Sequence, residues 1–302
     1  MEGRIKMKKI GFIGTGVMGA SIVKHLLKAG YPVAVYNRTK SKTDELIAKG
    51  ATWHETPASV TKESDVVFTI VGYPKDVEEV YLGKNGILQE ATPDKILVDM
   101  TTSTPTLAKK LFNKGQKLNI QVLDAPVSGG DLGAKNGTLT IMVGGNEEAY
   151  RQVEPIFEVF SGKVKLQGLA GSGQHTKMAN QIMIAGTMTG MTELLIYANA
   201  AGLNLESVLD TVGGGSAQNW SLTNYAPRIL KEDFTAGFFV KHFVKDLKIA
   251  LDEAKKMEIQ LPGTSLAEKL YEKLEEQGDG DDGTQALIKL WWPEGKAIPE
   301  ND

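Results

Sequence analysis

The chain has 302 residues, of which 41% are apolar and 24% charged, and its formal net charge is −3. This composition is that of an ordinary globular protein, and the length is typical of two domains. The charge balance does not favour binding to nucleic acid or to an anionic membrane. The absence of cysteine excludes disulfides, thiolate catalysis and cysteine–metal sites. The same absence suits a reducing compartment, so we expect a cytoplasmic protein. No apolar stretch reaches the ~18 residues of a membrane span.

The first motif is a short apolar run followed by three glycines. Residues 10–13 form the run, and Gly14, Gly16 and Gly19 follow with the spacing G-x-G-x-x-G. Helix-forming apolar residues come next, so the order is strand, tight turn and helix. One glycine permits the turn, a second lets a pyrophosphate approach the backbone, and a third lets helix and strand pack closely. The predicted dinucleotide contacts are Gly14, Thr15, Gly16, Val17, Met18 and Gly19.

The end of the second predicted strand, residues 31–36, carries a neutral amide and a cation. In NAD-binding domains an acidic residue about 20 positions after the glycines holds the ribose 2′-hydroxyl. Here Asn37 takes that position, and Arg38 and Thr39 follow it. An acidic side chain would repel a 2′-phosphate, whereas an amide beside an arginine favours it. Together with Lys40 and Lys42 close by, these residues predict a preference for NADP(H), with NAD(H) as the alternative cofactor. A solvated basic turn is the alternative interpretation.

Strands and helices alternate through the first half of the chain. Further apolar strands are predicted at residues 65–71, 96–99, 121–123 and 139–143. Helical segments are predicted at residues 41–49, 74–82, 104–118 and 146–160. Near-continuous apolar strands separated by helices are typical of a mostly parallel sheet covered on both faces. We therefore predict a Rossmann-type, doubly wound α/β domain over residues 1–167.

The loops that follow the strands are the candidate walls of the site, because ligands bind such sheets at the carboxyl ends of the strands. Two of these loops contribute Gly72, Tyr73, Pro74 and Thr102. A third, D-A-P-V-S-G-G at residues 124–130, places Gly129 and Gly130 beside Ser128. Consecutive glycine N–H groups can form a concave anion site. An ordinary tight turn explains the same residues equally well.

The pattern changes at the glycine-rich residues 167–173, which we predict to be a flexible joint. From residue 174 to about 201 the composition is helical and contains no proline. A helix of that length would span roughly 42 Å, enough to bridge two domains. Helical spacing continues at residues 204–213, 216–231, 243–258, 263–277 and 284–292. We therefore predict an all-helical second domain over residues 168–302, with Trp220 more suited to its core than to a substrate cleft.

Lys177 lies in the first turns of this long helix, where the helix dipole disfavours a cation. Asn180 and Gln181 share its face, three and four residues later. Such a conflict is expected where a lysine is kept for chemistry, although a solvated lysine is the alternative. Lys245, followed by Asp246, is either an exposed charge at a helix start or an ammonium over the interdomain cleft. The four histidines lack metal-ligand spacing, so we predict no catalytic metal.

In order, these motifs resemble the β-hydroxyacid dehydrogenase family, which includes 3-hydroxyisobutyrate dehydrogenase and the reductases of glyoxylate, succinic semialdehyde and tartronate semialdehyde. The matching stretches are G-F-I-G-T-G-V-M-G at 11–19, D-A-P-V-S-G-G at 124–130, G-S-G-Q-H-T-K-M-A-N-Q at 171–181 and K-D-L at 245–247. They cover the chain from end to end. The resemblance implies a Rossmann domain, a helical domain built on one long helix, and homodimers or homotetramers.

The resemblance also implies roles for individual residues. The substrate carboxylate would be held by Ser128, Gly129 and Gly130, with Thr102 beside them. Lys177 matches the catalytic lysine of the family, and Lys245 matches its cofactor-side lysine. Many relatives carry asparagine four residues after the lysine, where this chain has Gln181, and others read K-x-x-N-Q. Asn180 is therefore preferred as the substrate-binding amide, with Gln181 in reserve.

The function implied is an NADP(H)-dependent oxidoreductase that interconverts a small β- or γ-hydroxy acid and its (semi)aldehyde, most similar to the glyoxylate and succinic semialdehyde reductases. Lys177 would act as general acid and base. One alternative is an NAD-dependent 3-hydroxyisobutyrate dehydrogenase, and a less favoured one is a dinucleotide-binding protein without catalysis. The 6-phosphogluconate dehydrogenases carry a histidine–asparagine pair that this chain lacks, and similar imine reductases replace the lysine.

Overall fold

The computed structural model describes residues 7–297, which form two compact units. The first unit extends to Lys177, and the second begins at Met178. The change of unit therefore falls within a continuous helix, α8 (Ser172–Ala200). The predicted domain boundary at residues 167/168 lies instead at the end of the preceding strand, β9 (Ser161–Gly168).

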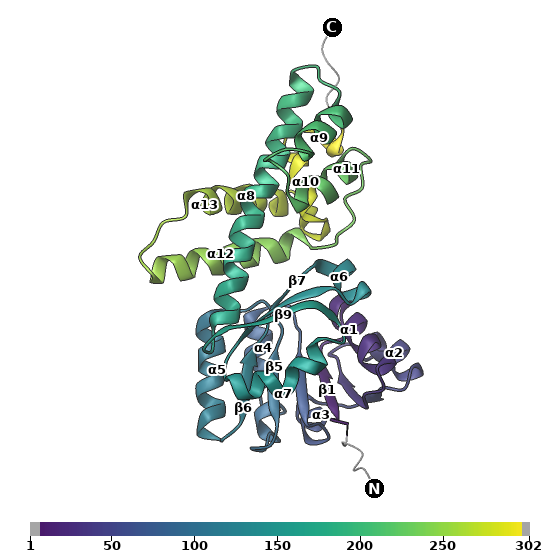
Figure 1. Ribbon diagram of the computed structural model, residues 1–302, viewed down its shortest axis with the longest axis vertical. Coiled ribbons are helices and arrows are strands. Elements are labelled where there is room, and N and C mark those ends of the chain that lie inside the picture. The colour runs from purple at the N-terminus through teal and green to yellow at the C-terminus, as the bar shows by residue number, and fades with distance from the viewer. Residues whose placement is uncertain (1–6, 298–302) are drawn as a thin grey trace. The chain divides into compact units, whose positions relative to one another are not determined.

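Within the described residues, the first unit contains one nine-stranded sheet with helices on both faces (Figure 1). The strand order is β3-β2-β1-β4-β5-β6-β8-β7, and β9 pairs with β8. Strands β1 to β6 run parallel, whereas β8 is antiparallel to β6 and β7. The order 3-2-1-4-5-6 is that of dinucleotide-binding domains, with the crevice where the strand order reverses, between β1 and β4. The remaining strands are β1 (Ile10–Ile13), β2 (Val33–Tyr36), β3 (Thr52–Trp53), β4 (Val66–Thr69), β5 (Ile96–Asp99), β6 (Gln121–Asp124), β7 (Val127–Ser128) and β8 (Leu139–Gly144).

Helices cover both faces of this sheet because its strands are apolar on both sides. Phe12 of β1 and Phe68 of β4 pack in one core cluster, where Phe68 also contacts Phe157. Their neighbours Ile13 and Val67 belong to a second cluster on the opposite face. The helices are α1 (Val17–Lys28), α2 (Asp44–Ala48), α3 (Pro57–Lys62), α4 (Pro74–Leu82), α5 (Pro105–Lys117), α6 (Gly130–Asn136) and α7 (Glu147–Phe157), with 3₁₀ turns η1 (Lys40–Thr43) and η2 (Ile87–Gln89).

The predicted Rossmann-type fold is confirmed, and the predicted strands at residues 10–13 and 96–99 match β1 and β5 residue for residue. Strand β9 was not predicted, because it alternates exposed lysines (Lys163, Lys165) with half-buried residues at an edge of the sheet. The flexibility predicted for the joint at residues 167–173 stays a prediction, and the change of unit falls after this segment, within α8. Gly168 ends β9, and the Gly171 N–H group donates a 2.7 Å hydrogen bond to Asp124.

The second unit is all-helical, as predicted, and is built around α8. Met188 and Leu195 of α8 lie in its core together with Phe243 and Tyr271, whose ring centroids are 4.8 Å apart. The other helices are α9 (Leu205–Gly213), α10 (Trp220–Asn224), α11 (Ala226–Ile229), α12 (Val240–Lys256) and α13 (Pro262–Glu276), with 3₁₀ turns η3 (Asp279–Asp281), η4 (Thr284–Leu290) and η5 (Pro293–Gly295).

Three predictions for the second unit are wrong in detail. The helix predicted at residues 216–231 is divided into α10 and α11, since Asn219 caps α10 and Pro227 lacks the N–H group that a continuous helix needs. Within the segment predicted at residues 284–292, residues 284–290 form the 3₁₀ helix η4 instead of an α-helix. Trp220 is 59% exposed and packs edge-on against Tyr225, so it is not a core residue.

Candidate active site

The glycine loop after β1 has the geometry that a dinucleotide requires. Gly14 has a positive φ of 96°, and a Cβ there would lie 2.0 Å from the Ile70 carbonyl oxygen. A Cβ on Gly19 would lie 2.0 Å from the Gly14 carbonyl oxygen, so both positions exclude a side chain. Gly16 differs, because a Cβ there meets no atom within 4 Å. Open space at the start of α1 suits a pyrophosphate on the free N–H groups of that helix.

The end of β2 supports this loop through Asn37. The Thr15 N–H group donates to Asn37 Oδ1 at 3.0 Å, and Asn37 Nδ2 donates to the Thr39 carbonyl oxygen at 2.9 Å. The Arg38 side chain is 86% exposed, and its guanidinium lies 3.8 Å from the Asp76 carboxylate. An ion pair so long and so exposed contributes little. The Arg38 cation is therefore accessible at the position that distinguishes the two dinucleotides.

The loops after β4 and β5 are joined at the same edge of the sheet. The Val71 N–H group donates to the Thr101 hydroxyl at 3.0 Å, which connects the loop of Gly72, Tyr73 and Pro74 with that of Thr102. The Tyr73 N–H group donates to Asp76 Oδ2 at 3.1 Å at the start of α4. Thr102 is half-buried, between two buried neighbours.

Ser128, Gly129 and Gly130 form the sharp link between β7 and α6. Gly129 and Gly130 have φ values of 124° and 63°, which L-residues with a side chain rarely adopt. Two successive residues of this kind turn the backbone sharply and suit a concave anion site. The far end of α6 is held by His25 of α1, whose Nε2 atom lies 3.1 Å from the Ala134 carbonyl oxygen and 3.0 Å from that of Lys135.

Lys177 lies in the first turns of α8, as predicted, where it is the sixth residue. Its side chain is buried, with 6% of its surface exposed. The alternative of a solvated lysine is therefore wrong. Burying an ammonium is costly unless other groups stabilise it. A buried lysine in the first turns of a helix is a group that the fold holds in place despite this cost.

The two amides after Lys177 do not have equal environments. Gln181 is buried, and its Nε2 donates to Asp246 Oδ2 at 2.8 Å. Its Oε1 accepts a hydrogen bond from Asn180 Nδ2 at 2.7 Å. Gln181 thus links Asn180 to a buried carboxylate, while Asn180 itself is only half-buried. Because Asn180 is the more exposed of the two, it is favoured as the amide that contacts substrate, with Gln181 holding it in place.

Lys245 and Asp246 lie inside α12 and not at its start, because that helix begins at Val240. Asp246 is fully buried, and its Oδ1 lies 3.1 Å from Lys245 Nζ. The interpretation of Lys245–Asp246 as an exposed charge at a helix start is therefore wrong. Asp246 forms an ion pair on one oxygen and accepts the Gln181 amide on the other.

Known proteins match this chain along nearly its whole length. Residues 9–168 match the NAD binding domain of 6-phosphogluconate dehydrogenase, and residues 171–291 match a family described as NAD-binding of NADP-dependent 3-hydroxyisobutyrate dehydrogenase. The chain is 52% identical to a probable 3-hydroxyisobutyrate dehydrogenase-like protein, mitochondrial, of Arabidopsis thaliana, over 93% of this chain and 84% of that protein. The chain belongs to the 3-hydroxyisobutyrate dehydrogenase-like β-hydroxyacid dehydrogenase family.

Two further similarities lie within this family. The chain is 36% identical to 2-hydroxy-3-oxopropionate reductase of Escherichia coli, over 93% of this chain and 96% of that protein. The solved structure of Mycobacterium tuberculosis 3-hydroxyisobutyrate dehydrogenase with L-serine has a TM-score of 0.88 and 29% identity, and covers 95% of this chain and 99% of that one. The protein is an NAD(P)-dependent enzyme of the hydroxyacid dehydrogenase family that acts on CH–OH groups. The alternative of a dinucleotide-binding protein without catalysis is set aside.

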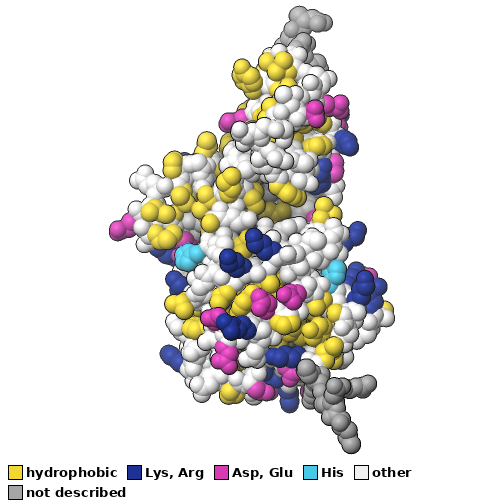
Figure 2. Space-filling view, in the orientation of Figure 1, with side chains coloured by type: hydrophobic (Ala, Val, Ile, Leu, Met, Phe, Trp, Pro, Cys, Tyr) yellow, Lys and Arg dark blue, Asp and Glu magenta, His cyan; other side chains and the backbone are white. Residues whose placement is uncertain are grey.

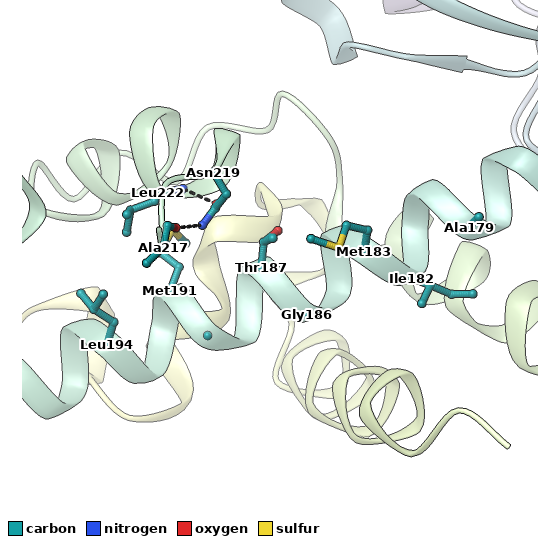
Figure 3. Close-up of a pocket in the computed structure, with 11 residues that line it drawn as sticks. Ala179, Ile182, Met183, Gly186, Thr187, Met191, Leu194, Ala217, Asn219 and Leu222 are labelled. Carbon is teal, nitrogen blue, oxygen red and sulfur yellow. Dashed lines mark hydrogen bonds between the residues drawn. The ribbon is translucent and has the colours of Figure 1, made fainter. Parts of the chain in front are cut away.

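A large apolar cavity lies elsewhere, along α8 in the second unit (Figure 3). It has a volume of about 630 Å³, and none of the predicted site residues lines it. Met183, Thr187 and Asn219 are among its walls. We do not assign the chemistry to it, because its lining contains no ionisable side chain.

Three further features of the described residues concern metal binding, membrane spans and surface charge. Among residues 7–297, no three His, Asp or Glu side chains lie together as a metal site would require. No helix in that range is long and apolar enough to cross a membrane. On the face of the first unit that Figure 2 shows, Lys and Arg side chains are interspersed with Asp and Glu.

Three supporting residues were missed by the sequence reasoning. Asp124 and Gln174 both lie in quoted motifs, yet neither was assigned a role, and Asp246 was treated only as a partner of Lys245. All three are buried polar residues. The signal for the first two was their place in the same motifs as predicted site residues: Asp124 ends β6 four residues before Ser128, and Gln174 precedes Lys177 by one helical turn.

Proposed function

We propose that the protein is an NADP(H)-dependent oxidoreductase that interconverts a small β- or γ-hydroxy acid and its (semi)aldehyde, with Lys177 as general acid and base. The observation that carries this proposal is the buried position of Lys177 in the first turns of α8. A lysine held in one place by its surroundings can transfer a proton to or from a substrate oxygen positioned beside it. The burial of Lys177 and its place in α8 make it the candidate for that role.

The glycine loop and the end of β2 would hold the dinucleotide. Residues 14–19 and the start of α1 would bind the pyrophosphate, and Asn37, Arg38 and Thr39 the adenosine ribose. Gly72, Tyr73, Pro74 and Thr102 would line the same crevice, with Lys245 on the cofactor side. When bound, the reduced nicotinamide supplies a hydride to the carbonyl carbon, and its oxidised form accepts one in the reverse direction. The exposed guanidinium of Arg38 supports a preference for NADP(H).

The chain's own residues would bind and orient the substrate. Ser128, Gly129 and Gly130, with Thr102, would bind the carboxylate, which fixes the carbonyl for reaction. Lys177 Nζ would donate a proton to the carbonyl oxygen during reduction and remove it during oxidation, and would exchange its proton with solvent between turnovers. The Asn180 amide would hydrogen-bond the same oxygen, held by Gln181.

The names of the relatives support two substrate classes. One relative reduces 2-hydroxy-3-oxopropionate, an aldehyde acid, which supports a semialdehyde reductase. Two others are named for 3-hydroxyisobutyrate, which supports that hydroxy acid as the substrate, without stating which dinucleotide is used. Homodimers or homotetramers and a cytoplasmic location remain part of the proposal.

A panel of small aldehyde acids tests the activity. Glyoxylate, succinic semialdehyde and 2-hydroxy-3-oxopropionate would be tested for NADPH oxidation, and 3-hydroxyisobutyrate and L-serine for NADP⁺ reduction. Lys177→Ala and Lys177→Arg should each lower kcat by about 10²-fold or more, while NADPH still binds. The proposal fails if no compound reacts or if Lys177→Ala keeps full activity.

The cofactor preference has its own test. Arg38→Asp should lower kcat/KM for NADPH by about tenfold or more, because a charge-assisted bond to the 2′-phosphate is replaced by repulsion. The value for NADH should stay unchanged or rise. Lys84→Asp makes the same charge change on an exposed loop and serves as control. A wild type that prefers NADH would favour the NAD-dependent alternative instead.

A further inference from the structure

The strand β6 and the start of α8 meet in a buried junction within the first unit. Asp124, the last residue of β6, accepts hydrogen bonds from two backbone N–H groups of α8 and the turn before it. Oδ1 accepts from Gly171 at 2.7 Å, and Oδ2 accepts from Gln174 at 2.9 Å. The first N–H groups of a helix lack partners within it. A side chain of the sheet therefore does what an N-cap residue normally does, and brings a carboxylate to the positive end of the helix.

Gln174 joins the same helix turn to the loop after β5. Its Nε2 donates to the Thr101 carbonyl oxygen at 2.7 Å, and its Oε1 accepts from the Ser103 N–H group at 3.0 Å. The side chain is fully buried, so these bonds form away from water. They hold the backbone on both sides of Thr102, the residue proposed to lie beside substrate and cofactor.

Two glycines allow the backbones to approach closely at this junction. A Cβ on Gly173 would lie 2.4 Å from the Met142 carbonyl oxygen, and a Cβ on Gly144 would lie 2.6 Å from Asp124 Oδ1. Neither position accepts a side chain without displacing a neighbour. The first turn of α8 is thus packed directly against the ends of β6 and β8.

Lys177 follows Gln174 by three residues, so the two side chains share one face of α8. A displacement of the first turn would move the Lys177 ammonium with it. We propose that Asp124 and Gln174 are positioning residues. They dock the first turn of α8 on the sheet and so fix the position of Lys177 relative to the loop of Thr102. This inference rests on the proposed role of Lys177 in the reaction.

The test compares two buried glutamines. Gln174→Met removes both bonds of the junction but keeps an apolar side chain of similar length. Gln285→Met is the matched control, because Gln285 is also fully buried and donates to two backbone carbonyls, those of Asp233 and Thr235, in the second unit. Both variants should lower Tm. Only Gln174→Met should lower kcat, by about 10- to 100-fold as expected for a misplaced catalytic group.

Asp124 is tested by two substitutions and by NADPH binding. Asp124→Asn keeps one acceptor oxygen, whereas Asp124→Ala keeps none, so kcat should fall further in the alanine variant. The Kd for NADPH should change much less than kcat in both. The inference would be overturned if both Gln174→Met and Gln285→Met lost kcat, and lost it in the same proportion to their fall in Tm. That result would show that Gln174 contributes to stability alone.

Hydrogen–deuterium exchange supplies a measurement that does not depend on activity. Peptides covering residues 171–177 should exchange about tenfold faster or more in Gln174→Met than in wild type, and not in Gln285→Met. Unchanged exchange in Gln174→Met, or faster exchange throughout the first unit, would overturn the inference. If wild type binds NADPH but reduces no aldehyde, the proposed function fails, and the exchange rates alone decide whether the junction docks the helix.

Discussion

Each unit buries an aspartate that accepts a hydrogen bond from a residue of α8, and the two carboxylates are used differently. Asp124 in the first unit accepts hydrogen bonds from the backbone N–H groups of Gly171 and Gln174. Asp246 in the second unit accepts the side-chain amide of Gln181 and pairs with the ammonium of Lys245. The first carboxylate therefore fixes a helix, whereas the second fixes side chains on a helix that is already formed.

This difference determines what each site can tolerate. A carboxylate bound to backbone needs close approach of two main chains, which is why glycine occupies positions 144 and 173. A carboxylate bound to side chains needs partners of the right length and charge, but places no demand on the backbone. Substitutions at the two sites should therefore differ in both size and kind of effect.

The largest effect is expected for Asp246→Ala. This change leaves the Lys245 ammonium, whose side chain is 13% exposed, without its carboxylate partner. Breaking a buried ion pair by removing one member costs about 3–5 kcal/mol. Urea unfolding should show a loss of this size, and a smaller one for Asp246→Asn, since a carboxamide oxygen can still accept from Gln181.

Asp210→Ala is the matched control, because Asp210 is an exposed aspartate in the same unit. It should change the free energy of unfolding by about 0.5 kcal/mol at most. An Asp246→Ala variant as stable as this control would show that the ion pair contributes no net stability. Asp246 would then position side chains without adding to the free energy of unfolding.

A pair of glycines in α8 gives the next largest effect, and the sign of the change is informative. Alanine normally stabilises a helix interior by about 1 kcal/mol relative to glycine. Gly190→Ala should follow this rule, since a Cβ at Gly190 meets no atom within 4 Å. Gly173→Ala should do the opposite, with a loss of about 1–3 kcal/mol from overpacking against Met142 and Asp124.

Thermal and urea unfolding of both variants measure this contrast. A stabilising effect of Gly173→Ala would mean that the backbones at the junction can separate without cost. That result would remove the main difference between the two aspartates. A lower kcat in Gly173→Ala, with kcat unchanged in Gly190→Ala, would support this difference, because it would link the close packing at the junction to the reaction.

The smallest effect concerns pH. Burial raises the pKa of Asp124 above its usual value, although the N–H groups of Gly171 and Gln174 act in the opposite direction. A carboxyl group whose pKa is raised by folding stabilises the fold fully only below its unfolded pKa, about 3.9. That contribution is lost as pH rises through the folded pKa.

The stability of wild type relative to Asp124→Asn should therefore decline as pH increases from about 4 toward 6. Urea unfolding of both proteins at several pH values in this range measures the difference. A relative stability that increases with pH would mean that the folded state prefers the charged carboxylate. The hydrogen bonds from Gly171 and Gln174 would then outweigh the cost of burial.

The sequence was most informative where local pattern and tertiary environment agree. The apolar run at residues 96–99 is a strand buried on both faces, so β5 could be predicted to the residue. The glycine loop at 14–19 combines turn, strand and helix signals and was found for the same reason. By contrast, β9 is an edge strand with exposed lysines, and no local pattern distinguishes it from a loop.

The candidate site was predictable as a set of motif residues but not as a network. Lys177 was identified from its motif, yet its burial depends on packing that no spacing reveals. The contact between Gln174 and Thr101 joins residues 73 positions apart. The start of α12 was placed three residues too late, and for that reason a helix start was one of the two interpretations given for Lys245, which lies in the helix interior.

The junction around Asp124 also has a consequence for how such chains diverge. Positions 124, 144, 173 and 174 act as one unit, because each is constrained by an atom of another or by the same backbone. A replacement at one of them creates a clash or an unpaired N–H group that a second replacement must repair. Across homologous chains these four positions should be inherited or lost together, although they are scattered along the sequence.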